Sequence, residues 1–220
     1  MSSYQPNEAL LTSLHNKILV MVVGPTSIGK STLMKKVCEL DPEFSYVQAF
    51  TTRPRRDDAP STYRHITESE AATLYASRQA VTYIPHPTTG YIYGTDHASY
   101  KSHYNLLDTL SSTVELYRNL PFKRTVTISL TAELVDWQRW LALRFNTPSS
   151  ELTKRLEEAK TSIEWSIAQR DNHAWLINSE VNLEDCAQQV IEHARGTKQL
   201  PSDTPKEATD LLKYVKNLLS

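Results

Sequence analysis

The sequence contains only two cysteines, Cys38 and Cys186, and neither has a second Cys or a His beside it at the spacing of metal ligands. This scarcity excludes a disulfide framework and a zinc motif. It suits a reducing compartment, so we expect a cytoplasmic protein. The first residues also lack a basic segment followed by an apolar core. We therefore expect no signal peptide.

The sequence also lacks a surplus of charge and a long apolar run. The 220 residues include 24 Lys and Arg against 25 Asp and Glu, a net charge of −1. Nucleic-acid-binding domains usually carry a basic surplus, so we expect no nucleic-acid partner, and any anion site must be local. No apolar run approaches the ~20 residues of a membrane helix, so no membrane partner is expected. The length fits one domain with inserted subdomains.

Strand and helix patterns alternate along the chain. A β-branched apolar run at 17–23 is typical of a strand buried on both faces, and helical spacing follows at 31–40. A capping-box pattern at 67–70 opens another helix. Further strands are predicted at 45–52, 80–84, 91–93, 105–110, 125–130 and 174–178, and helices at 112–120, 131–145, 151–170, 183–194 and 206–219. This alternation predicts an α/β fold with a parallel sheet flanked by helices.

The loop between the first strand and the first long helix carries the most specific motif. Residues 24–31 satisfy G-x-x-x-x-G-K-[ST] in full. In such a P-loop, backbone N–H groups and the N-terminus of the helix bind phosphate oxygens. Lys30 supplies charge to the β and γ phosphates, and Ser31 can ligate Mg²⁺. A chance match is the alternative, but the flanking strand and helix argue against it.

The P-loop predicts ATP as the phosphate donor, with Mg²⁺. The residues expected to bind ATP are Gly24, Pro25, Thr26, Ser27, Ile28, Gly29, Lys30, Ser31 and Thr32.

A series of motifs follows the P-loop: TTRPRR at 51–56, Tyr63, YIYGT at 91–95, LLD at 106–108, RF and KRL around 144–156, and LIN at 176–178. In type and order they resemble those of the guanylate kinase family of P-loop nucleoside monophosphate kinases. The resemblance implies a P-loop NTPase fold with a small α/β insertion for the acceptor and a mobile lid. It also implies ATP-dependent phosphorylation of a nucleoside monophosphate.

The resemblance also suggests how the chain is divided. It implies an N-terminal extension at 1–16, a guanylate kinase-like domain at 17–196 and a C-terminal helical extension at 197–220. Within the domain, we expect the core at 17–52 and 105–196, the acceptor-binding insertion at 53–104 and the lid at about 144–155. The last helix is expected to pack on its own domain, and the chain to be a monomer or a homodimer.

Four side chains are expected to hold the acceptor's phosphate. Arg53 and Arg56 match the family's two phosphate-binding arginines, although the Gly-Glu that follows them in the family is missing. Tyr63 and Tyr93 match its phosphate-binding tyrosines. Guanidinium groups bind an oxyanion with bidentate geometry, and tyrosine hydroxyls add neutral donors. Taken alone, the RPRR segment would be a solvated basic loop.

The reaction itself is expected to use Lys30, Arg56, Asp108, Arg144 and Arg155. The resemblance places Arg144 and Arg155 in the lid, where they would support the transferred phosphate. A surface ion pair is the alternative for Arg155. Asp108 matches a family carboxylate near the metal and the acceptor, or it caps its strand.

Two further positions concern the adenine of the donor and the lid. Asn178 matches a residue that contacts the adenine, and a turn asparagine is the alternative. A third lid arginine of the family falls at Trp140, with Arg139 next to it.

The positions that would read a guanine depart from the family. Thr95 matches a small hydroxyl residue facing the base, but Thr82 stands where the family has its first guanine-reading carboxylate. Leu110 replaces the second carboxylate. Residues 71–95 contain no Asp or Glu, and Asp96 is the nearest substitute. Because a threonine oxygen cannot match a carboxylate across two guanine donors, we expect GMP to be a weak acceptor.

Three classes of function therefore compete. The chain is a nucleoside monophosphate kinase, a kinase of the same fold with a non-guanine or ribose-phosphate acceptor, or a non-catalytic interaction module. Intact Lys30 and Ser31 disfavour the third class. The expected partners are ATP and a small phosphorylated acceptor.

Overall fold

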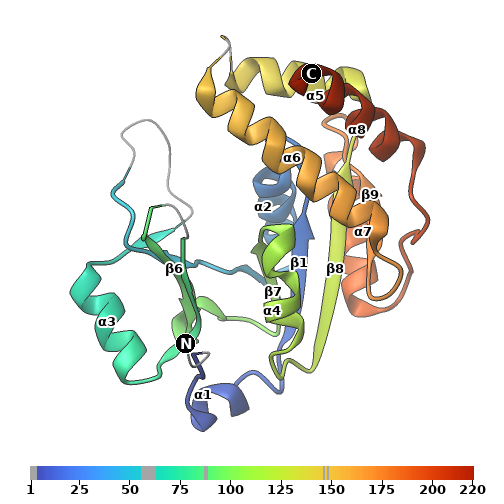
Figure 1. The fold of residues 1–220 in the computed structure, drawn as a ribbon. Helices are drawn as coiled ribbons and strands as arrows, with labels where there is room; N and C mark the ends of the chain where they lie inside the picture. The colour runs from blue at the N-terminus through green and yellow to red at the C-terminus, as the bar shows by residue number, and fades with distance from the viewer. Residues whose placement is uncertain (1–3, 56–62, 87–88, 146, 148) are drawn as a thin grey trace.

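A parallel sheet forms the centre of the molecule (Figure 1). The computed structural model describes residues 4–55, 63–86, 89–145, 147 and 149–220. Within them the sheet has the strand order β2-β7-β1-β8-β9, and its neighbouring strands all run parallel. The strands are β1 (Ile18–Val23), β2 (Phe44–Tyr46), β7 (Tyr104–Asp108), β8 (Arg124–Thr131) and β9 (Ala174–Ile177). The predicted α/β fold with a parallel sheet is confirmed.

Strand β1 is buried along its whole length because both faces of the sheet are covered. Val20 and Val22 pack into one hydrophobic cluster, while Leu19 and Met21 pack into another. The first cluster includes α2 (Lys30–Leu40), α5 (Leu134–Arg144), α6 (Ser150–Ala168), α7 (Leu183–Arg195) and α8 (Lys206–Leu219). The second includes α4 (Val114–Arg118), which follows the short helix η2 (Ser111–Thr113). Helices on both faces thus explain the unbroken apolar run of β1.

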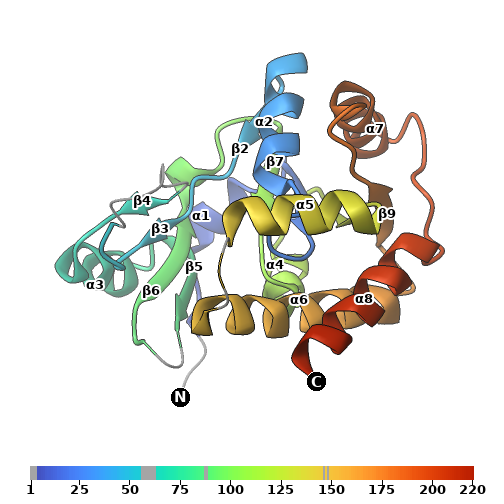
Figure 2. The ribbon, with the colours of Figure 1, turned by 90° about the horizontal axis from the view of Figure 1, so that it is seen from above.

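A second, smaller sheet lies to one side with α3 (Glu68–Ala76), opposite α7 and α8 (Figures 1 and 2). Its order is β4 (Arg64–His65), β3 (Phe50–Thr51), β6 (Ile92–Asp96) and β5 (Ala80–Pro85). The short helix η1 (His97–Ser99) follows β6. Gly94 makes the pairing of β5 and β6 possible, since a Cβ there would lie 2.2 Å from the Thr82 carbonyl oxygen. Most of this sheet and α3 fall within the predicted insertion at 53–104, but β3 comes from residues that were assigned to the core.

The strand predicted at 45–52 is wrong as a single element. Its first part pairs with β7, and the Val47 N–H still donates to the Leu106 carbonyl. Three residues later, Phe50 pairs with Gly94 in the small sheet. The segment therefore passes from one sheet to the other, which its continuous pattern in the sequence did not indicate.

Both ends of the described chain pack onto the domain. Leu211 and Val215 of α8 are fully buried, and Lys216 pairs with Glu164 of α6 at 2.9 Å. At the other end, α1 (Glu8–Thr12) contributes buried Leu10 to the second cluster. The C-terminal helix thus packs as predicted. In the part of the chain that the structure covers, no helix combines the length and apolar character that crossing a membrane requires.

Candidate functional site

The loop between β1 and α2 has the backbone geometry that a phosphate site needs. Gly24 and Gly29 adopt φ values of +153° and +88°, where a side chain would be strained. Ser27 also has a positive φ, +60°. No side chain caps the N-terminus of α2, because Gly29 is its N-cap residue. The end of α2 and its dipole are therefore available to an anion.

Two side chains from distant elements hold this loop in place. The Trp137 indole on α5 donates to the Thr26 carbonyl at 2.8 Å. The Asn178 amide, just after β9, donates to the Ile28 carbonyl at 2.8 Å. Ile28 is itself fully buried. The loop is thus fixed by packing and hydrogen bonds before any ligand arrives.

Asn178 is used by the protein itself in this structure. The residue is only 4% exposed, and its amide nitrogen would lie 2.4 Å from a Cβ at Gly29. The expected contact with adenine stays a prediction, while the contact with the loop is direct.

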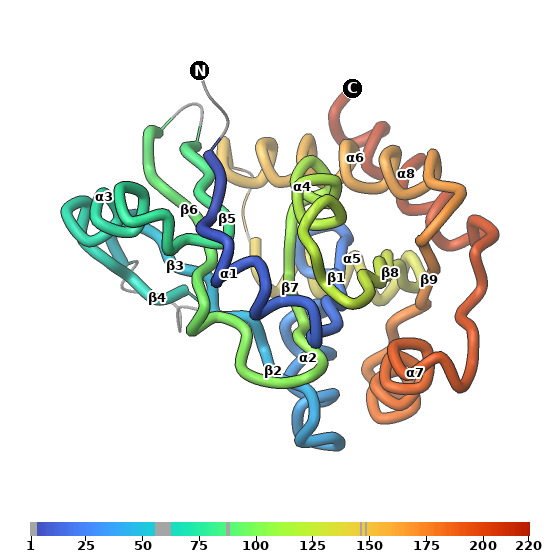
Figure 3. The backbone as a smooth tube through the Cα atoms, turned by 90° about the horizontal axis from the view of Figure 1, so that it is seen from below, coloured from blue at the N-terminus to red at the C-terminus, as the bar shows by residue number. Residues whose placement is uncertain are grey.

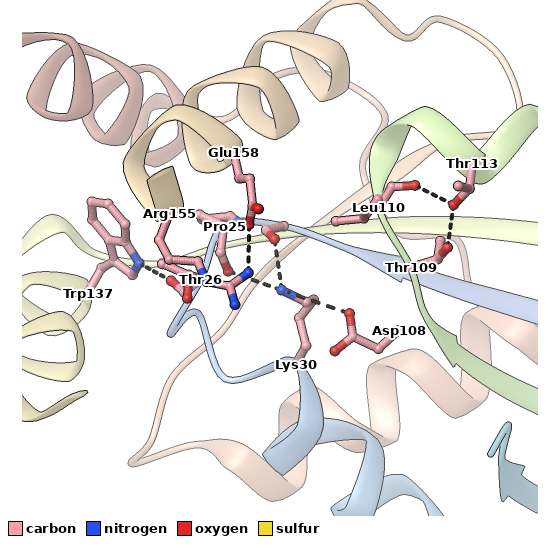
Figure 4. A network of polar contacts seen from close by, with 11 residues as sticks. Pro25, Thr26, Lys30, Asp108, Thr109, Leu110, Thr113, Trp137, Arg155 and Glu158 are labelled. Atoms are coloured by element: carbon pink, nitrogen blue, oxygen red, sulfur yellow. Dashed lines mark hydrogen bonds and ion pairs between the residues drawn. The ribbon is translucent and has the colours of Figure 1, made fainter. Parts of the chain in front are cut away.

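Lys30 and Asp108 face each other across the ends of two adjacent strands (Figure 4). The Lys30 Nζ donates to the carbonyls of Gly24 and Pro25 at 2.8 and 3.1 Å, and lies 3.9 Å from Asp108 Oδ1. Strand pairing explains the proximity, because Asp108 is in register with Val22 two residues before the loop. Burial raises the pKa of Asp108, while the charges of Lys30 and Arg144 lower it.

A pocket next to Asp108 opens between the core and the small sheet. It is lined by Tyr46, Val47, Ala49, Tyr63, Leu107 and Asp108. The sequence indicated Tyr63 and Asp108 for this region but not Tyr46 or Val47, because its pattern predicted one strand over 45–52. In the structure β2 ends at Tyr46. One carboxylate therefore lies beside both the loop lysine and the pocket.

Three of the expected phosphate-binding residues lie together, and one of them, Tyr63, lines this pocket. The rings of Tyr63 and Tyr93 meet edge to face at 5.6 Å, and the Arg53 guanidinium lies 5.9 Å from the Tyr63 ring. The Arg53 Nε is buried and has no hydrogen-bond partner among the described residues. Burial raises the pKa of Tyr63 to about 12, and the Asp108 carboxylate adds to that shift. Arg56 lies outside the described residues.

The two arginines expected in the lid lie on successive helices. Arg144 is the last residue of α5, and Arg155 lies near the start of α6. Arg144 is exposed and stacks near the Phe145 ring at 5.6 Å. Arg155 donates to Glu158 at 2.8 Å (Figure 4) and lies 3.8 Å from Glu151. Arg155 thus makes the surface ion pairs that were its alternative, and its lid role stays a prediction.

Arg139 and Trp140, at the position of the family's third lid arginine, both bond to Glu180. Arg139 donates to Glu180 at 2.8 Å and to Asp136 at 3.2 Å, and the Trp140 indole donates to Glu180 at 3.3 Å. These bonds connect α5 to the segment after β9. In this structure Arg139 is thus held by carboxylates beside α5.

The two threonines expected at the acceptor's base are closed inside the protein. Thr82 is 2% and Thr95 0% exposed, and their hydroxyls are 2.9 Å apart. Thr82 also meets the Tyr117 hydroxyl at 3.3 Å, and Thr95 meets the Tyr100 hydroxyl at 2.8 Å. Tyr100 and Tyr117 are buried as well. We call these four residues the hydroxyl cluster.

The other positions tied to guanine reading do not supply a free carboxylate. Asp96 pairs with Arg64 and accepts from Ser99 at 3.1 Å. Leu110 is 61% exposed. The described part of the site therefore offers the acceptor's base few acceptors for its N–H groups.

The chain is similar in sequence to known guanylate kinases. It is 24% identical over 187 residues to guanylate kinase of Thermotoga maritima, which covers 82% of this chain and 87% of the relative. It is 26% identical over 153 residues to guanylate kinase of Synechococcus elongatus, covering 66% and 82%. No family model matches the chain.

The fold is also similar to that of a solved guanylate kinase. The crystal structure of guanylate kinase from Anaplasma phagocytophilum has a TM-score of 0.50 and 17% identity, covering 86% of this chain and 89% of that one. With the G-x-x-x-x-G-K-S loop at the end of β1, this likeness is consistent with a P-loop NTPase fold, a parallel sheet flanked by helices. The sequence relatives confirm the predicted resemblance to the guanylate kinase family.

Proposed function

We propose that the protein transfers the γ-phosphate of ATP to a small phosphorylated acceptor, most simply a nucleoside monophosphate, in the cytoplasm. The observation that carries this proposal is the place of Asp108. It lies 3.9 Å from the loop lysine and lines the pocket that contains Tyr63. A donor phosphate on the loop and an acceptor phosphate in the pocket would meet at this carboxylate.

On the donor side, the loop backbone and the end of α2 would bind the ATP phosphates. Lys30 would exchange the carbonyls of Gly24 and Pro25 for phosphate oxygens. No group of three His, Cys, Asp or Glu residues in the described chain could hold a metal by itself. Mg²⁺ usually takes one or two protein oxygens besides phosphates and water, so Ser31 and Asp108 fit it, and the ion would supply charge neutralisation there.

On the acceptor side, Arg53 supplies a buried Nε that has no hydrogen-bond partner in the described part of the chain, and Tyr63 and Tyr93 would supply hydroxyls. With its pKa at about 12, the Tyr63 hydroxyl keeps its proton at neutral pH and would donate a hydrogen bond to a phosphate oxygen. Arg144 and Arg155 would add charge when the lid closes, with Arg155 leaving Glu158 for the phosphate.

The nature of the acceptor separates the two enzymatic candidates. The hydroxyl cluster and the Arg64–Asp96 pair favour an acceptor that is not recognised through guanine, such as another nucleoside monophosphate or a ribose phosphate. A site without partners for a buried polar edge discriminates against that ligand. A non-catalytic module remains the weakest candidate because the loop lysine and serine are both present.

The decisive experiment is a coupled ATP-turnover assay with Mg²⁺ and a panel of acceptors. The panel contains GMP, dGMP, AMP, CMP, UMP, dTMP and ribose 1,5-bisphosphate. We expect turnover with at least one acceptor, weak use of GMP, and loss of activity in excess EDTA. If none of the acceptors supports ATP turnover, the kinase proposal is wrong. Strong selectivity for GMP would contradict the argument that the site does not read guanine.

A further inference from the structure

The N-terminal segment, residues 4–14, contacts the small sheet and the central core at once. Figure 3 shows the chain running along the small sheet before α1 and then continuing into β1 of the parallel sheet. This segment was expected to be an extension outside the domain. Its contacts instead link the two parts of the protein that carry the acceptor site and the phosphate loop.

The first contact is made by the Tyr4 hydroxyl on strand β5. This hydroxyl donates to the Ala80 carbonyl at 2.9 Å and accepts from the Ala80 N–H at 3.1 Å. Because β5 is the edge strand of the small sheet, these two backbone groups have no neighbouring strand to pair with. The Tyr4 ring packs against Tyr75 and Tyr83 at 5.1 and 5.8 Å.

The second contact holds the turn between α3 and β5. Arg78 has a φ of +56°, an uncommon conformation for a residue with a side chain. Its carbonyl accepts from the Asn7 N–H at 2.9 Å, and its Nε donates to the Gln5 carbonyl at 2.8 Å. The segment therefore bonds to both the backbone and the guanidinium group of Arg78.

The other end of the segment is anchored in the core. Leu10 and Leu14 are 7% and 1% exposed, in the same cluster as Met21 of β1 and Tyr117 of α4. Val81 of β5 belongs to that cluster too. The segment thus contacts the small sheet through polar groups at its start and the core through Leu10 and Leu14 at its end.

Strand pairing extends the effect of Tyr4 to the acceptor site. Ala80 begins β5, and Ile84 of the same strand is in register with Tyr93 of β6. Tyr93 in turn packs against Tyr63 at the pocket. Any movement of β5 away from the core therefore moves the two tyrosines expected to bind the acceptor's phosphate.

We infer that residues 4–14 act as a strap that fixes the small sheet against the core, and that Tyr4 is a positioning residue for the acceptor site. The consequence for the acceptor rests on the proposed function. The fixing of the sheet does not, since it follows from the contacts alone.

The strap is tested by hydrogen exchange on the full chain, with no substrate present. Tyr4→Phe keeps the ring and removes the two bonds to Ala80, so the Ala80 amide should exchange several-fold faster, up to about tenfold. Thr12→Ala is the matched control, because its hydroxyl bonds only within α1. Equal exchange in Tyr4→Phe and wild type overturns the strap.

Positioning is tested with the acceptor that the panel identifies. We expect Tyr4→Phe and Tyr4→Ala to raise the acceptor KM about twofold to tenfold, with the ATP KM unchanged and Thr12→Ala like wild type. An acceptor KM equal to that of wild type, or equal losses on both substrates, overturns the positioning role. If wild type uses no acceptor, the proposed function fails and hydrogen exchange still decides the strap.

Discussion

The side-chain amide of Asn178 donates to the Ile28 carbonyl at 2.8 Å, so the end of β9 supports the phosphate loop directly. The bond joins residues 150 positions apart in the sequence. It passes next to Gly29, where a Cβ would lie 2.4 Å from the amide nitrogen. The conformation of the loop therefore depends on a residue that need not touch a nucleotide.

Asn178→Ala should lower the free energy of unfolding by ~1–3 kcal/mol, because a buried carbonyl loses its hydrogen bond. Urea denaturation measures this change. Gly29→Ala should also destabilise, since φ at this position is +88° and the new Cβ meets Asn178. If the contact is real, the double variant costs less than the sum of the two single variants. Strict additivity would contradict it.

Lys30→Ala should abolish ATP-dependent phosphate transfer and leave the fold intact, because the lysine acts on charge that develops at the transferred group. Turnover and circular dichroism measure the two effects. Lys36→Ala is the matched control on the same helix, since its ammonium pairs with surface carboxylates. Equal turnover in the Lys30 variant and wild type would remove the lysine from the mechanism.

Arg53→Ala should raise the acceptor KM by an amount that corresponds to ~1–3 kcal/mol, the range for a lost charged hydrogen bond. Steady-state kinetics at saturating ATP provides the measurement. Exposed Arg55 is the control two residues away. We expect Arg55→Ala to keep the acceptor KM of wild type, and a similar rise in both variants would point to a general effect of basic charge.

Thr82→Val should destabilise the protein by ~1–3 kcal/mol and leave the ranking of acceptors unchanged, because its hydroxyl bonds inside the hydroxyl cluster. The acceptor panel and urea denaturation test both parts. Tyr117→Phe removes the other end of the same bond and should behave alike. A changed ranking of acceptors would show that Thr82 faces the ligand.

His173 should make the protein less stable in acid. Burial, with a smaller effect of Arg118, lowers its pKa to about 4, against 6.5 for an ordinary histidine. Between about pH 6.5 and pH 4, the unfolded chain therefore binds more protons than the folded chain. The free energy of unfolding falls as the pH drops through this range. His173→Gln should weaken this dependence, whereas exposed His15→Gln should keep it. Identical pH profiles for His173→Gln and wild type would contradict the shift.

The loop at 24–31 between a strand and a helix could be predicted because its signal is local. Eight consecutive residues define the motif, and hydrophobic spacing predicted the strand before it and the helix after it. The resemblance gave Asp108 a place near the metal and the acceptor, and strand pairing explains why it lies beside Lys30. A parallel sheet brings the carboxyl ends of neighbouring strands to one edge, so distant residues meet there in a regular way.

The hydroxyl cluster and the strap could not be predicted in the same way. Tyr4 and Ala80 are 76 positions apart, and no spacing rule relates a tyrosine to the open edge of a strand. Thr82 was placed at the ligand by its alignment with the family, but side-chain packing decides which way a buried threonine points. In the structure, its hydroxyl has protein partners on two sides.

The alternation of β1 between two clusters has a consequence for how the loop tolerates mutation. Val22 points into one cluster and Met21 into the other, and the loop leaves the strand two residues after Val22. Deleting one residue from β1 would exchange the two faces of the strand and draw Gly24 back by one position. The number of residues in β1 thus determines how far the loop lies from Asp108. Substitutions in β1 should therefore be tolerated far better than insertions or deletions in this strand.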